Sequence, residues 1–238
     1  MGGEWDRLTV AAPHASIAVV VASAVLALAL AGWPRAWRFA RVGITLAHEG
    51  SHALAALVCG RSLHGMRIHR DTSGVTVSRG PARGLGAVLT FAAGYPGPAV
   101  LGVLGAWLLR GGYPGLLLLA VLVVLVGMIL QIRNWFGLLA VAACGGPVAA
   151  ILWWCPPSVH MAVALVMVWL LLFGGLRTVV DLQHDRSAGG SAGGGQLSDA
   201  DQLARLTPFP ALLWVTVFAL ISVAAVLLGG ALLWGELR

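Results

Sequence analysis

The sequence contains no lysine and has few charged residues of either sign. Only 10% of its 238 residues are charged, whereas a typical soluble domain carries about 25%. The fifteen arginines are scattered between apolar runs, so no basic patch for nucleic acid is present. The three cysteines form no CxxC pair, which excludes a disulfide framework and a cysteine-based zinc knuckle.

Apolar residues, by contrast, make up 59% of the chain. Long apolar runs recur on the scale needed to cross a bilayer core, about 18 residues; they are 16–33, 85–109, 116–130, 159–176 and 208–234. We therefore predict an all-α polytopic membrane protein with about six or seven transmembrane helices, in one membrane-embedded domain over 1–238. We expect a multi-pass integral protein of a bacterial cell membrane.

Two segments differ from the apolar runs. Residues 62–80 alternate apolar and polar side chains on either side of the turn-forming stretch Asp71-Thr-Ser-Gly74, which predicts a β-hairpin. Residues 182–207 are expected to form a Gly-rich loop and a short helix capped by Ser198. The stretch GYPGP at 94–98 predicts a kink or break in the apolar run 85–109.

The candidate chemistry lies in LAHEGSHALAA, residues 46–56. An ionisable residue at membrane depth is costly and by default marks a functional site. On a helix, His48 and His52 share one face and can bind one metal ion. Glu49 is the only acidic residue between Asp6 and Asp71, and it is placed to accept a proton from a metal-activated water. A buried His–Glu–His hydrogen-bonded cluster is the structural alternative.

A catalytic zinc site usually has three protein ligands and a water. The aspartates after the motif are the candidates for the third ligand, because the next glutamate is Glu236. Asp71 fits the hairpin turn. Asp199 and Asp201 follow Ser198 and fit the capped start of a short helix. We therefore predict Asp181, just after the apolar run 159–176, as the third ligand, with Asp185 as the alternative.

These motifs resemble the site-two protease family of intramembrane zinc metallopeptidases. The resemblance covers about residues 45–210 and rests on HEGSH, the hairpin LHGMRIHRDTSGVTVSRG, GYPGP, RNWFGLL and TVVDLQHD followed by SDADQLARL. It is strongest to the compact bacterial and plant-type branch without attached soluble domains. The chain departs from the family's N-x-x-P…D-G pattern, since NWFG at 134–137 has glycine in place of proline and no Asp-Gly follows.

The resemblance implies Zn²⁺ as cofactor, His48 and His52 as ligands, and Glu49 as the acid and base. It also implies that the protein cleaves transmembrane segments of other proteins, for which we expect single-span substrates in the lipid bilayer. We further expect an unwound substrate to pair with the hairpin near Val75 and Val77. The alternatives are a membrane protein that binds or transports metal, and an inactive scaffold of the same fold.

Overall fold

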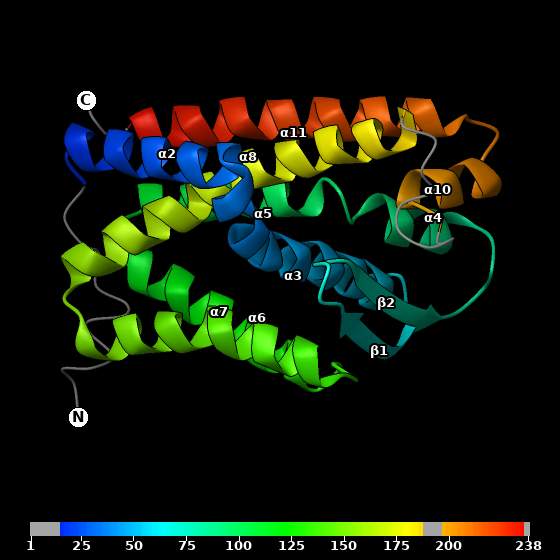
Figure 1. Ribbon diagram of the computed structural model, residues 1–238, viewed down its shortest axis with the longest axis horizontal. Coiled ribbons are helices and arrows are strands. Elements are labelled where there is room, and N and C mark those ends of the chain that lie inside the picture. The colour runs from blue at the N-terminus through cyan, green and yellow to red at the C-terminus, as the bar shows by residue number, and fades with distance from the viewer. Residues whose placement is uncertain (1–14, 188–196, 236–238) are drawn as a thin grey trace.

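The computed structural model describes residues 15–187 and 197–235 as a helical bundle with one small sheet (Figure 1). The bundle's helices are α2 (Ile17–Gly32), α3 (Pro34–Val58), α4 (Leu85–Ala92), α5 (Gly97–Arg110), α6 (Pro114–Ile129), α7 (Trp135–Trp154), α8 (Pro157–Ser187), α10 (Asp199–Leu206) and α11 (Ala211–Trp234). The strands are β1 (Ser62–Ile68) and β2 (Gly74–Arg79). The predicted hairpin and the predicted short helix are both present. The loop predicted from residue 182 begins later, because α8 continues to Ser187, and its Gly-rich residues 188–196 lie outside the described residues.

Several helices carry the composition of membrane spans. Among the described residues, α7, α8 and α11 are long and apolar enough to cross a membrane, and the count rises to five if each of two bent helix pairs is one span. The six or seven spans expected from the sequence are therefore not confirmed. That expectation treats α2 and the apolar segment that contains the motif as two separate spans. It also includes α6, which has only 16 residues.

The two bent pairs break where the sequence places proline. Between α2 and α3 the chain turns by 102°, and Pro34 occupies the first turn of α3, where its missing N–H costs no hydrogen bond. Between α4 and α5 the turn is 72°, and it falls in the GYPGP stretch as expected. Three arginines, Arg35, Arg38 and Arg41, lie in the first turns of α3.

Helix α8 is the central element of the bundle. It packs against α5, α2, α11 and α6, and its buried apolar side chains between Met161 and Leu172 belong to the largest apolar cluster. Close approach is possible because Gly175 has no side chain, and a Cβ there would lie 2.9 Å from the backbone nitrogen of Ala99. The C-terminal part of α8 runs beside α11 and ends near α10 (Figure 1).

The hairpin has one occupied edge and one open edge. Strands β1 and β2 are antiparallel, with Met66 opposite Thr76. The outer side of β1 binds the segment before α7, because Met66 N–H donates to Gln131 O at 2.7 Å and Arg133 N–H donates to Met66 O at 2.9 Å. The amide of Asn134 continues this pairing on Ile68, donating to its carbonyl at 2.6 Å. Within the described residues, the outer edge of β2 pairs with no other strand, whereas β1 makes a bridge between Met66 and Ile132.

Helix α10 is short but firmly held. Ser198 and Asp201 form a capping box at its N-terminus. Ala200 and Leu203 are fully buried in an apolar cluster with residues of α8 and α11, among them Leu182 and Phe218. These contacts fix the first turn of α10 next to α4 and α3, where it reaches the motif helix.

Candidate metal centre and proton acceptor

Helix α3 presents the motif as its spacing predicts. Residues four apart lie on one helix face, and the Nε2 atoms of His48 and His52 are 3.1 Å apart. The side chain of His52 is buried, and Glu49 is only 3% exposed. The imidazole of His52 and the carboxylate of Glu49 are therefore withdrawn from bulk solvent, while His48 is partly exposed.

A backbone carbonyl determines which nitrogen of His52 faces the centre. His52 Nδ1 lies 2.7 Å from Thr90 O on α4. Because a carbonyl only accepts, Nδ1 carries the proton and the lone pair of Nε2 remains available for a metal. The hydroxyl of Thr90 in turn donates to Gly86 O at 2.7 Å, within its own helix. Helix α4 thus orients a metal ligand that α3 supplies.

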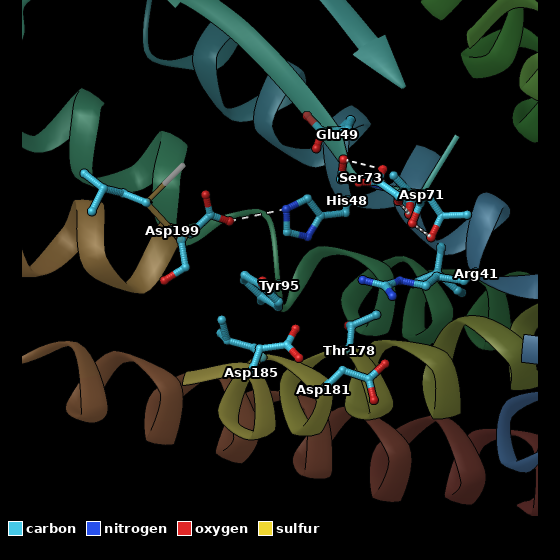
Figure 2. Close-up of a pocket in the computed structure, with 17 residues that line it drawn as sticks. Arg41, His48, Glu49, Asp71, Ser73, Tyr95, Thr178, Asp181, Asp185 and Asp199 are labelled. Carbon is cyan, nitrogen blue, oxygen red and sulfur yellow. Dashed lines mark hydrogen bonds and ion pairs between the residues drawn. The ribbon is translucent and has the colours of Figure 1, made fainter. Parts of the chain in front are cut away.

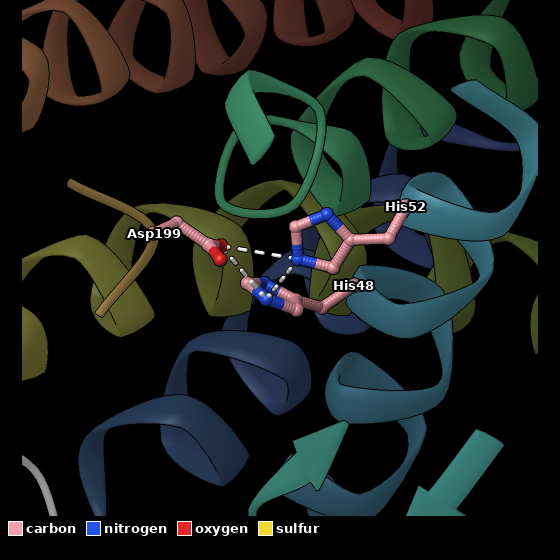
Figure 3. Close-up of side chains that lie close together, drawn as sticks. All are labelled: His48, His52 and Asp199. Carbon is pink, nitrogen blue, oxygen red and sulfur yellow. Dashed lines mark hydrogen bonds and ion pairs between the residues drawn. The ribbon is translucent and has the colours of Figure 1, made fainter. Parts of the chain in front are cut away.

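Asp199, at the start of α10, completes a group of three (Figure 3). Its Oδ2 lies 3.3 Å from His48 Nε2 and 3.1 Å from His52 Nε2. Within residues 15–187 and 197–235, these three side chains form the group of histidine, cysteine or acidic residues that could hold one metal ion. The third member comes from an element that the sequence leaves far from the motif.

The size and chemistry of this triangle fit a zinc ion. Two atoms bound tetrahedrally to zinc at about 2.0–2.2 Å lie about 3.3–3.6 Å apart, and the triangle's edges are 3.1–3.3 Å. Asp199 Oδ2 is buried without a hydrogen bond from the described residues, although both Nε2 atoms are near. Two imidazoles and one carboxylate are also the donor set of many catalytic zinc sites.

The predicted third ligand, Asp181, lies elsewhere, and the structure does not bring it to the histidines. Its Oδ2 accepts a hydrogen bond from Trp37 Nε1 at 3.2 Å, and its Oδ1 lies 3.8 Å from Nε of Arg177. The alternative, Asp185, is exposed one turn further along α8. In Figure 2 both carboxylates project from α8 across a cavity from His48. The carboxylate that lies beside the two histidines is that of Asp199, and not that of Asp181.

A second set of contacts holds Asp199 in place. Arg186, at the end of α8, donates to Asp201 Oδ1, and its guanidinium also lies 3.3 Å from Ser198 Oγ. Burial alone would raise the pKa of the Asp199 carboxyl, but the two neighbouring imidazoles hold that pKa well below its ordinary value. Asp199 is therefore a carboxylate, the form that binds a metal.

Glu49 is held by the hairpin. Thr76 Oγ1 on β2 donates to Glu49 Oε2 at 2.6 Å. On the other side, a Cβ at Gly74 would lie 2.5 Å from Glu49 Oε1, so only glycine leaves room for the carboxylate there. No pattern in the sequence indicates these two contacts, because they depend on how the hairpin folds back onto α3.

The group opens onto a polar cavity of about 330 Å³ (Figure 2). His48, Glu49 and Asp199 form one wall, and the turn of the hairpin and the end of α8 form the others. Tyr95, from the GYPGP break, lies against His48 with ring centroids 4.8 Å apart and also lines the cavity. Water can therefore reach the three candidate ligands from this cavity.

A model of the Peptidase M50B-like family matches residues 21–229. The chain belongs to this family. No curated protein and no solved structure matches the chain. Membership confirms the resemblance to the site-two proteases and makes the protein an integral membrane protein of a metallopeptidase family. The matched range contains the motif helix, the hairpin and α10, so this M50B-like chain carries all the groups described above.

Proposed function

We propose that the protein is an intramembrane zinc endopeptidase that cleaves transmembrane segments of single-span membrane proteins. The observation that carries this proposal is the convergence of His48 Nε2, His52 Nε2 and Asp199 Oδ2 beside the buried carboxylate of Glu49. In this proposal His48, His52 and Asp199 hold the ion. A bound zinc ion supplies a Lewis acid that polarises the scissile carbonyl and lowers the pKa of a water.

The residues of the chain perform the proton transfers. Glu49 accepts the proton of the attacking water and passes it to the leaving amide nitrogen, so one carboxylate acts first as base and then as acid. Thr90, through His52 Nδ1, holds the imidazole in the required tautomer. Burial of Glu49 excludes bulk water, which strengthens its interaction with the reacting proton.

The open edge of β2 supports a docking role for the hairpin. A peptide must be extended before its carbonyl can be attacked, and an extended peptide can add to an unpaired strand edge. Val77 is 50% exposed and Val75 is half-buried. The start of β2 borders the cavity that contains the metal group. We propose that substrate pairs with β2 near these two valines.

The test measures zinc content in purified variants of the protein. It measures cleavage in cells that co-express each variant with candidate single-span proteins. Glu49→Gln should retain about one zinc per chain and lose cleavage, because an amide cannot accept the proton. Asp199→Ala should lose zinc and cleavage, whereas Asp185→Ala and Asp181→Ala should retain zinc. Full cleavage by Glu49→Gln would refute the mechanism, and zinc without any cleavage by the wild type would favour a metal-binding or scaffold role.

A further inference from the structure

The carboxylate of Glu49 has one well-defined partner. Thr76 Oγ1 lies 2.6 Å from Glu49 Oε2 and 3.2 Å from the backbone oxygen of the same residue. Among the described residues, no second side chain donates a hydrogen bond to that carboxylate. The threonine comes from the hairpin, while the glutamate comes from the motif helix, so the contact joins two separate elements at the reacting group.

The geometry leaves the two carboxylate oxygens in different positions. Oε2 is occupied by the threonine hydroxyl, whereas Oε1 lies beside Gly74, at the start of β2 and on the wall of the cavity. A hydrogen bond to an ionised acceptor is among the stronger kinds, and it restricts rotation of a side chain that has three rotatable bonds. Oε1 is then the oxygen free to accept a proton.

Strand β2 is itself fixed relative to α3. Thr45 Oγ1 donates to Thr72 O at 2.8 Å, directly before the strand. Side chains alternate along a strand, so Thr76 points toward α3 while the neighbouring residues Val75 and Val77 point away from it. One strand can therefore offer its edge to a substrate and its inner face to Glu49.

We infer that Thr76 is a positioning residue for the chemical step: its hydroxyl holds Oε2 of Glu49 so that Oε1 accepts the proton of the attacking water. This inference rests on the proposed function, and it assigns the hairpin a role in the chemical step in addition to docking. Preorganised second partners of this kind keep a reacting group within a fraction of an ångström of its productive position.

The test is kinetic and uses a substrate that the wild type cleaves. Thr76→Val keeps the shape of the side chain and removes the hydroxyl. Its kcat should fall by about 10–100-fold, a part of the roughly 10²–10⁴-fold that a positioned base contributes, with KM and zinc content unchanged. Thr76→Ser, which keeps a hydroxyl at this position, should retain most of the wild-type kcat. Thr216→Val, in which the lost hydroxyl bonds only within α11, is the matched control.

An infrared measurement checks the same contact without cleavage. The carboxylate stretching band of Glu49 is the one that disappears in Glu49→Gln. Its frequency should shift in Thr76→Val and should stay at the wild-type value in Thr76→Ser. An unshifted band in Thr76→Val overturns the inference, and so does a wild-type kcat in this variant. Loss of zinc in Thr76→Val also overturns it, because the contact would then maintain the metal site. If wild type and Glu49→Gln cleave nothing, the proposed function fails while the band still tests the contact.

Discussion

Replacing Gly94 with alanine should empty the metal site without altering any ligand. Gly94 lies in the break between α4 and α5, and its φ angle is not positive. Alanine can therefore adopt the backbone conformation there, and the substitution acts only through the added methyl group. That Cβ would lie 2.4 Å from His52 Nε2 and 2.6 Å from Asp199 Oδ2.

The distances set the size of the effect. Ordinary contact with a Cβ begins at 3.4 Å, so the imidazole and the carboxylate would have to retreat by about 0.8–1.0 Å. Metal–ligand distances tolerate only about 0.2 Å. Replacing a group that only hydrogen-bonds to a metal ligand already weakens metal binding by about 10–100-fold. Displacing two ligands should cost at least about 100-fold in zinc affinity, or about 2.7 kcal/mol.

The assay is competition between the detergent-purified protein and a chromogenic zinc chelator, with cleavage measured in parallel. Gly43→Ala is the control, since it lies on α3 itself and its Cβ would meet nothing within 4 Å. In a helix interior this change should leave stability equal or slightly higher. Wild-type zinc affinity in Gly94→Ala would refute the reasoning, because the ion could then not lie among the three atoms as the structure arranges them.

Two further predictions concern Glu49 and Asp199 separately. Gly74→Ala should reduce cleavage at least about tenfold while zinc content stays constant, because the three atoms nearest to the added Cβ all belong to the Glu49 side chain, the closest at 2.5 Å; equal loss of zinc would contradict this. Arg186→Glu should weaken zinc binding by releasing the first turn of α10, and exchange of the charges in Arg186→Glu/Asp201→Arg should restore part of it. Additive effects in that double-mutant cycle would show that the pair does not position Asp199.

Local patterns in the sequence predicted local structure well. The hairpin follows from alternation within residues 62–80, and the short helix follows from Ser198 and the residues behind it. The break after α4 follows from Pro96 in the GYPGP stretch. Each of these depends on side chains within a few positions of one another. The number of spans was not predictable in the same way, because the 102° turn at Pro34 depends on how α2 and α3 pack on α8.

The third candidate ligand shows where such reasoning fails. Asp181 was preferred because it ends an apolar segment, whereas Asp199 was assigned to a helix cap. In the structure a single carboxylate, that of Asp201, completes the cap with Ser198. A capping box uses the third helical residue, so Asp199 at the first position remained available, and this was the signal that the sequence contained. Its contact with the histidines arises only from packing of α10 against α8, α4 and α11.

The arrangement of the proposed site also has a consequence for the order of synthesis. The ribosome completes the HEGSH helix early and reaches α10 only after α8 has been made. Until α10 has emerged and its Leu203 is buried beneath α8 and α11, His48 and His52 have no carboxylate partner. A partly synthesised chain would therefore carry the whole motif and remain inactive. In the proposed enzyme, activity would arise with one of the last packing steps of folding.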